Sequence, residues 1–251
     1  MTISRRRFIG AAGAAGALAA TGGLRSMARA VSPGLAARSA AVPLPDASGI
    51  DHIVVVMMEN RSFDHFLGWM PGADGVQSGA YVDSDGTTYD LSQQLLTGEY
   101  NGCAHPDPDH SWEGGRYQLN GGALNGFASG ANDAFAIGHY QESDRPFMSA
   151  LARNFTTLDR YHCSILAETF PNRFFMHSAQ TDRLHNNGIA STTISPTIWD
   201  RLAAKGVSAK YYFSDVPFIG LWGTTYLSIS HTYADFLVDA LAGTLPAVSF
   251  I

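Results

Sequence analysis

Ile-Asp-His-Ile-Val-Val-Val-Met-Met at residues 50–58 is the stretch that decides the fold. This β-branched, apolar run predicts a strand that is buried on both faces, as the strands of a parallel sheet usually are. The run stops at Glu59-Asn60, so these two residues follow the carboxyl end of the strand. Open α/β sheets bind their ligands beyond that end.

The segments around this strand predict alternating helices and strands. Ser62 is a predicted N-cap for a helix at 63–69, which Pro71-Gly72 ends. Residues 71–135 are rich in Gly, Asn, Asp and Ser and predict long irregular loops. Further helices are predicted at 146–153, 171–179 (with Pro171 at its start), 196–205 and 232–242, and strands at 155–163, 207–213 and 247–251. This order predicts an α/β fold with a mostly parallel sheet and flanking helices.

Length and charge exclude several classes of protein. The chain has 251 residues, 45% hydrophobic and 15% charged, which is enough for a sizeable core and argues against a disordered chain. Its formal net charge is −6, and all six Arg before Asp46 precede the first acidic residue. Without them, 10 cationic residues face 22 acidic ones, a net charge of −12. This excess of negative charge argues against nucleic acid as a partner and favours binding of a hard cation.

Residues 1–45 have the order of an export signal and linker. Arg5-Arg6-Arg7 is followed by an apolar run at 9–24 and by Ala28-Arg29-Ala30, a small-residue cleavage site. The paired arginines resemble a twin-arginine signal, whose export machinery carries folded protein. We therefore expect residues 46–251 to be the exported part, located extracellularly or at the cell envelope. The alternative is a membrane anchor, for which the apolar run is short and rich in Gly and Ala.

Only two cysteines are present, Cys103 and Cys163, which excludes a disulfide-dense scaffold and a Cys-rich zinc site. In an oxidising compartment the two could pair, and the alternative is two buried thiols without a disulfide. Sequence separation does not decide between a disulfide and two thiols, because pairing depends on the Cβ geometry.

Three places in the sequence carry candidate chemistry, and each has a purely structural explanation as well. Glu59 and Asn60 offer neighbouring oxygen ligands for a hard divalent cation, or they cap the next helix. Thr169 lies just before a predicted helix start, where N–H groups favour a phosphoryl group, or it only caps that helix. The loop at 105–112 holds His105 and His110 together with two Asp residues and could bind metal or phosphate, or it is an Asp-rich turn.

Together these residues resemble the bacterial phosphoesterase family, which contains phosphatidylcholine-type phospholipases C and an acid phosphatase group. Glu-Asn-Arg-Ser-Phe-Asp-His-Phe-Leu-Gly at 59–68 is similar to its opening signature. Asp-Pro-Asp-His-Ser-Trp at 107–112 resembles the second motif. Asp-Arg-Tyr-His-Cys-Ser at 159–164, with Thr169 and Pro-Asn-Arg at 171–173, resembles the third. The similarity covers essentially all of residues 50–251.

The resemblance implies an alkaline-phosphatase-like α/β fold and a hydrolase that acts on phosphoric esters. It implies that Thr169 is the nucleophile, that Glu59, Asn60 and Thr169 bind a divalent metal ion, and that His110 contacts the substrate phosphate. The Thr at position 169 favours the phospholipase C branch, with phospholipid or another phosphoester as substrate and contact with a membrane surface. The second hypothesis is an acid phosphatase-type phosphomonoesterase.

The sequence departs from the family pattern in one respect. The family completes its metal site with a carboxylate pair further along, whereas residues 182–251 hold only isolated Asp residues. We therefore expect the N-terminal part of a phosphoesterase, truncated before its second half, with a weak metal site and little or no activity. We also expect its last strand to form an exposed apolar edge. Two further hypotheses are an inactive remnant and, from the loop at 117–135, a secreted metal- or carbohydrate-binding module.

Overall fold

The computed structural model describes residues 48–59, 61–97, 102–185, 187–188 and 196–251. Residues 51–251 form one compact unit, and every element named below belongs to it. The export signal predicted at 1–45 lies outside the described residues. None of the described helices has the length and hydropathy that a membrane span requires.

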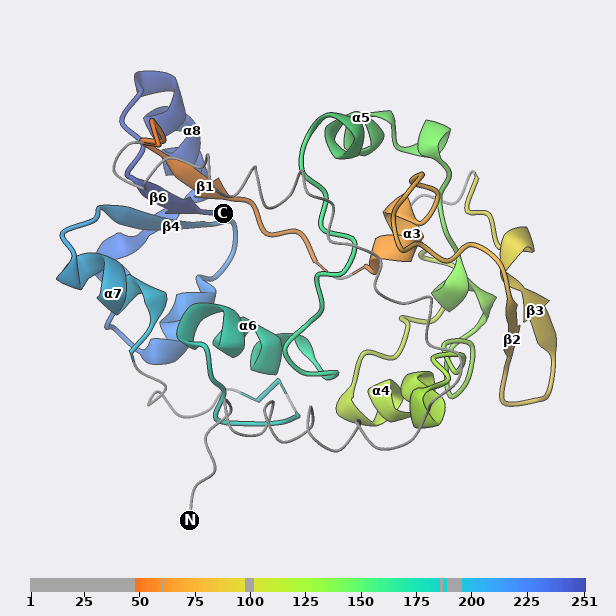
Figure 1. The fold of residues 1–251 in the computed structure, drawn as a ribbon. Coiled ribbons are helices and arrows are strands. Elements are labelled where there is room, and N and C mark those ends of the chain that lie inside the picture. The colour runs from red at the N-terminus through yellow and green to blue at the C-terminus, as the bar shows by residue number, and fades with distance from the viewer. Residues whose placement is uncertain (1–47, 60, 98–101, 186, 189–195) are drawn as a thin grey trace, which may run out of the picture. The chain divides into compact units, whose positions relative to one another are not determined.

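Four parallel strands make the main sheet (Figure 1). In spatial order they are β1 (Ile53–Val55), β6 (Val248–Phe250), β4 (Ala209–Phe213) and β5 (Ser230–Thr232). Each neighbouring pair runs parallel. The predicted α/β class, with a mostly parallel sheet and flanking helices, is therefore confirmed.

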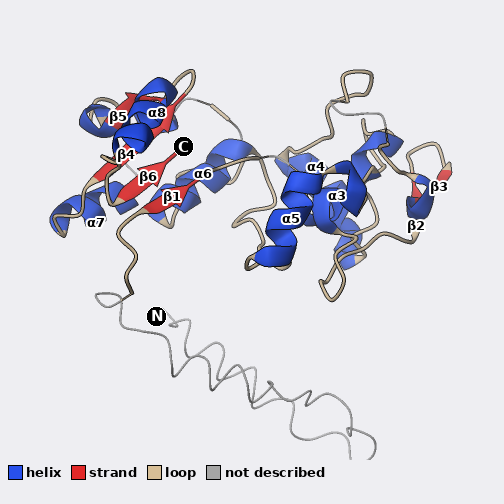
Figure 2. Ribbon diagram, turned by 90° about the horizontal axis from the view of Figure 1, so that it is seen from above, coloured by secondary structure: helices blue, strands red, loops and turns tan. Residues whose placement is uncertain are grey.

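Helices lie on both faces of this sheet (Figures 1 and 2). Side chains alternate along β4, so that Tyr211 packs with Trp199 of one helix while Tyr212 packs with Phe236 of another. The described α-helices are α3 (Phe63–Leu67), α4 (Trp112–Leu119), α5 (Pro146–Asn154), α6 (Thr169–Ser178), α7 (Ile198–Ala204) and α8 (Tyr233–Ala242). Trp199 thus places α7 on one face, and Phe236 places α8 on the other.

An aromatic core lies between the sheet, α6 and α7. The rings of Tyr211 and Phe250 stack at 5.1 Å between centroids, and Phe174 of α6 packs edge-on to Trp222 at 5.0 Å. The buried members of this aromatic core are Phe174, Trp199, Tyr211, Phe218, Ile219, Trp222, Tyr226 and Phe250. Because aromatic rings bury large apolar areas, this core fixes α6, the helix that begins at Thr169.

The N-cap predicted at Ser62 is confirmed. The Ser62 hydroxyl accepts a hydrogen bond from the His65 amide at 3.2 Å. At the start of α7, Thr197 and Asp200 form a capping box in which each side chain accepts a bond from the other residue's amide. Thr197 is also buried, and its hydroxyl lies 2.7 Å from the Tyr226 hydroxyl.

Replacing Thr197 by Ala is expected to lower the free energy of unfolding by about 2 kcal/mol, because both the cap and a buried hydrogen bond are lost. Thr197→Ser keeps the hydroxyl and should cost less than half as much. Chemical denaturation at neutral pH measures both variants. Equal losses in the two variants would mean that the methyl group, and not the hydroxyl, holds the helix start.

The prediction of a strand at 155–163 is wrong. α5 ends at Asn154, and the following residues form an irregular segment whose side chains are mostly exposed. Their polar groups bond locally or to other loops. The Thr157 hydroxyl donates to the Ala152 carbonyl at 3.0 Å, and the Asp159 carboxylate accepts from the Asp74 amide at 2.8 Å. Such side-chain bonds replace the ladder that a strand needs.

Two expectations about sheet position are also wrong. Burial of the first strand on both faces is not observed, since Ile53, Val54 and Val55 are 55%, 40% and 38% exposed. Within the described sheet β1 is an edge strand, which explains this exposure. The last strand does not form an edge, because β6 pairs on both sides, and Ser249 and Phe250 are buried.

The loop prediction for 71–135 holds only in part. An antiparallel hairpin of β2 (Ala80–Val82) and β3 (Thr88–Asp90) lies there, followed by α4. The sequence does not predict α4, because Gly114 and Gly115 lie within it and glycine is a poor helix former. The structure gives their reason: any side chain at Gly114 would collide with the Asp109 carboxyl group, and one at Gly115 with Leu166.

Cys103 and Cys163 are not joined by a disulfide, and both are exposed. Pairing is therefore not observed, and the expectation of two buried thiols is wrong as well.

Candidate active site

Glu59 and Thr169 meet although 110 residues separate them. The Thr169 hydroxyl donates to Glu59 Oε1 at 3.1 Å. Glu59 follows β1 at the carboxyl end of the strand, and Thr169 is the first residue of α6. The structure thus joins two of the residues that the sequence predicts for one site.

Asn172 shapes the loop that leads into Thr169. Its side-chain oxygen accepts from the Ile165 amide at 3.0 Å. Its side-chain nitrogen donates to the carbonyl oxygens of Ile165, Ala167 and Glu168, at 2.9, 3.2 and 3.0 Å. One amide group therefore fixes the path of the chain just before the Thr169 hydroxyl.

Arg173 lies one helical turn after Thr169 and contacts the same carboxylate. Its Nε donates to Glu59 Oε2 at 3.1 Å, with the two side chains 24% and 31% exposed. Tyr211, which belongs to the aromatic core, interacts with this pair, and burial raises the pKa of its hydroxyl. Tyr211 is therefore a neutral partner of the site at physiological pH.

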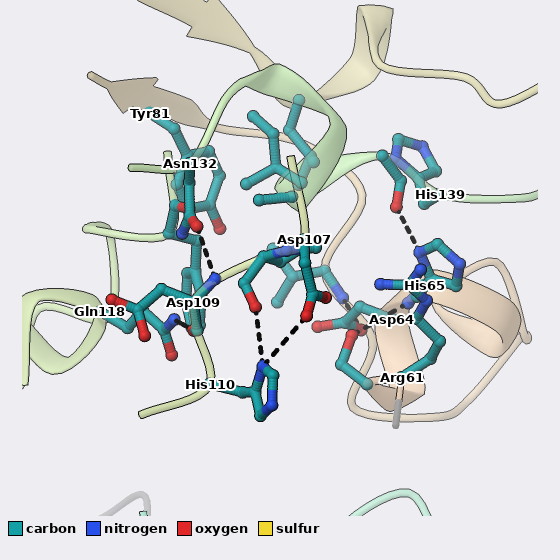
Figure 3. Close-up of a pocket in the computed structure, with 18 residues that line it drawn as sticks. Arg61, Asp64, His65, Tyr81, Asp107, Asp109, His110, Gln118, Asn132 and His139 are labelled. Atoms are coloured by element: carbon teal, nitrogen blue, oxygen red, sulfur yellow. Dashed lines mark hydrogen bonds and ion pairs between the residues drawn. The ribbon is translucent and has the colours of Figure 1, made fainter. Parts of the chain in front are cut away.

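The loop around His110 lines a cavity of about 260 Å³ (Figure 3). Tyr81, Asp109, Gln118 and Asn132 lie on one side of the view, Arg61, Asp64, His65 and His139 on the other, and Asp107 and His110 between them. The His110 Nδ1 is 3.0 Å from the Pro108 carbonyl oxygen and 3.9 Å from the Asp107 carboxylate. Among the described residues no hydrogen bond or ion pair joins His110 to Glu59 or Thr169.

α4 connects this cavity to the loop before Thr169. Asp109 holds the start of α4 through a 2.9 Å bond from the Ser111 amide, and the side-chain and backbone bonds of Ser111 lower the pKa of Asp109. Further along the helix, Arg116 donates to the Leu166 carbonyl at 3.0 Å. The helix that follows the second sequence motif therefore contacts the loop of the third.

The buried ionisable groups of the cavity are shifted toward their neutral forms. Burial lowers the pKa of His65 and of His139, and His65 Nδ1 bonds the Gly138 carbonyl at 2.7 Å. Burial also raises the pKa of Asp64, although its Oδ1 accepts from the Val76 amide at 2.8 Å. At neutral pH His65 and His139 are thus uncharged.

The phosphoesterase family model matches residues 50–251, which include both β1 and the whole of this site. The chain belongs to the phosphoesterase family. The resemblance seen in the three motifs is therefore confirmed.

Several relatives of this chain are phospholipases C. Non-specific phospholipase C1 of Arabidopsis thaliana is 30% identical over 227 residues, covering 80% of this chain and 42% of that protein. Phospholipase C A of Mycobacterium tuberculosis is 32% identical over 160 residues, or 55% of this chain and 31% of that protein. Non-hemolytic phospholipase C of Pseudomonas aeruginosa is 30% identical over 294 residues, covering 99% of this chain and 41% of that protein. The chain thus spans less than half the length of these relatives.

The metal ligands predicted for this chain are brought together only in part. Glu59 and Thr169 are in contact, whereas Asn60 lies outside the described residues. Carboxylate and hydroxyl oxygens fit a hard divalent cation in kind. In number they fall short of the four to six ligands such an ion takes, and the described residues hold no cluster of three or more His, Cys, Asp and Glu.

The sequence alone indicated no role for Asn172 or Arg173, although both belong to the third motif. The spacing of Asn172 and Arg173 from Thr169 is the signal that could have indicated their roles. Residues three and four after Thr169 return to its face of α6, and there a polar and a cationic side chain can reach the loop and the carboxylate.

Proposed function

We propose that this phosphoesterase hydrolyses phosphoric esters, with phospholipase C-type cleavage of phospholipid head groups and Thr169 as the nucleophile. The hydrogen bond from the Thr169 hydroxyl to Glu59 carries the proposal, because a nucleophile needs an acceptor for its proton within bonding reach. The phospholipases C among its relatives support the choice of substrate.

The mechanism begins with in-line attack of Thr169 Oγ1 on phosphorus. The Oγ–P bond forms as the bond to the alcohol oxygen breaks, and the alcohol leaves with a proton. Glu59 Oε1 orients the attacking oxygen and is the nearest acceptor for its proton. Water then attacks the phospho-threonine, which releases the phosphorylated head group and restores the Thr169 hydroxyl.

The proposed divalent cation would be held by Glu59, Thr169 and Asn60. When bound, it would lower the pKa of the hydroxyl and offset charge on the phosphoryl oxygens. Because the described donors are few, its affinity and the turnover of this chain are expected to be low. His110 is the proposed contact for the substrate phosphate from the cavity side.

The proposal extends to where the enzyme works. The twin-arginine-type segment at 1–45 supports export by the corresponding machinery to the extracellular space or cell envelope. There a phospholipid substrate would be met at a membrane surface.

Comparing two chromogenic substrates tests the proposed function. With added divalent cation, p-nitrophenyl phosphorylcholine is expected to be hydrolysed at least about tenfold faster than p-nitrophenyl phosphate, since a diester enzyme recognises the group beyond phosphorus. A chelator should remove both activities if the cation is required. Preference for the monoester would favour a phosphomonoesterase, and no hydrolysis of either ester would contradict an active enzyme.

A further inference from the structure

Both oxygens of the Glu59 carboxylate are held by one turn of α6. Oε1 accepts from Thr169 and Oε2 accepts from Arg173, each at 3.1 Å. The two donors are four residues apart in the helix, so their side chains lie on the same face. The guanidinium group is thereby placed next to the hydroxyl through a shared partner.

Arg173 is held more firmly than a surface arginine. Only 24% of its side chain is exposed, and its guanidinium carbon lies 5.3 Å from the centre of the Phe218 ring. Tyr211, from the same aromatic core, interacts with the guanidinium through its hydroxyl. An aromatic face and two polar partners therefore fix the position of the group.

We propose that Arg173 is a further substrate-binding residue of this site, and that its terminal N–H groups bind a non-bridging oxygen of the phosphoryl group. Guanidinium has five N–H bonds in a planar fork, and the ion pair with Glu59 uses only the one on Nε. The fork of N–H groups matches the oxygens of a phosphate group.

The charges at the site give the reason for such a residue. A phosphoester anion that approaches Thr169 meets the negative charge of Glu59, which repels it. Among the described residues, Arg173 is the one cationic side chain in contact with Glu59. It offsets the carboxylate in the free site and supplies attraction for the anion. The inference rests on the proposed function of the same site, but anion binding can be measured without turnover.

Titration of the full chain with inorganic phosphate tests the proposal, by calorimetry or ³¹P NMR. Arg173→Gln is expected to weaken phosphate binding about tenfold to a hundredfold, because it removes both the charge and the fork. Arg173→Lys keeps the charge and the long side chain, so it should fold even if the Gln variant does not. It should still bind about fivefold more weakly, since an ammonium group cannot form the bidentate contact.

Arg160→Gln is the matched control. Arg160 is 72% exposed and pairs with Asp74 at 2.8 Å, so removing its charge changes the net charge equally but leaves the site intact. Phosphate binding in this variant should equal that of the wild type. Wild-type binding in Arg173→Lys, equal losses in Arg173→Lys and Arg160→Gln, or no phosphate binding by the wild type would each overturn the proposal.

The outcomes also separate this inference from the proposed function. Phosphate binding that depends on Arg173, in a chain that hydrolyses neither chromogenic ester, would support the binding role and refute the activity. Hydrolysis that depends on Thr169, with phosphate binding unchanged in Arg173→Lys, would support the activity and refute the role of Arg173.

Discussion

Thr169→Ala is expected to reduce phosphoester hydrolysis by roughly a thousandfold or more, to the background rate. The reason is that the attacking oxygen itself is removed, while the position of Glu59 is also held by Arg173. Initial rates with p-nitrophenyl phosphorylcholine measure the loss. Phosphate binding should remain within about threefold of wild type, because the hydroxyl is not its main ligand in our proposal.

Thr156→Ala is the matched control for this prediction. Thr156 is exposed and lies in the turn after α5, so the same change of side chain is made away from the site. Thr169→Ser keeps a hydroxyl and should retain a measurable fraction of the rate. Turnover in Thr169→Ala that matches the Thr156→Ala variant would show that another group attacks phosphorus.

Elements governed by local interactions could be predicted from the sequence. Ser62 indicates a helix start because a cap satisfies amides only two or three residues away. The strand at 53–55 follows from its β-branched run, and its parallel pairing follows from the alternation of helices and strands. None of these features depends on a distant partner.

Features set by distant partners could not be predicted. Residues 155–163 resemble a strand in composition, but the Asp159 carboxylate accepts from the amide of Asp74, 85 residues earlier in the chain, and no pattern reveals this partner. β6 lies centrally because β1, almost 200 residues earlier, pairs with its outer side. The order of strands in a sheet is decided by such contacts and not by the hydropathy of one segment.

The candidate site also has one part that could be predicted from the sequence and one that could not. Glu59 and Thr169 could be paired in advance because the family resemblance makes both of them ligands of one metal ion, and the structure brings the two side chains into contact. The role of Arg173 depends on where α6 begins, since the sequence predicts a start at Pro171 and the helix in fact starts at Thr169. With the predicted start, Arg173 would not have shared a helical face with the hydroxyl.

Acid is expected to destabilise this protein through His177, a buried histidine of α6. The ring is 2% exposed, lies 5.2 Å from Phe250 and 5.8 Å from Phe218, and its Nε2 has no hydrogen-bond partner among the described residues. Burial, with a smaller contribution from the charge of Arg173, lowers the pKa of His177 to about 4. The imidazole is therefore neutral in the folded protein at pH 7.

The sign and size of the effect follow from the two pKa values of His177. In the unfolded chain the pKa is near 6.5, so between pH 6.5 and about 4 the unfolded state binds a proton that the folded state does not. Stability is therefore full above pH 6.5 and falls as the pH drops through this window. At pH 4 the loss from His177 alone is about 3 kcal/mol.

His177→Phe isolates this contribution, because it keeps a ring in the aromatic core and removes the titrating group. Between pH 7 and pH 4 its free energy of unfolding should fall by about 3 kcal/mol less than that of the wild type, measured by urea denaturation. His162→Phe, made at an exposed histidine, should follow the wild type. If His177→Phe loses as much stability as the wild type, protonation of His177 is not what acid acts on, and the carboxylates must account for the loss.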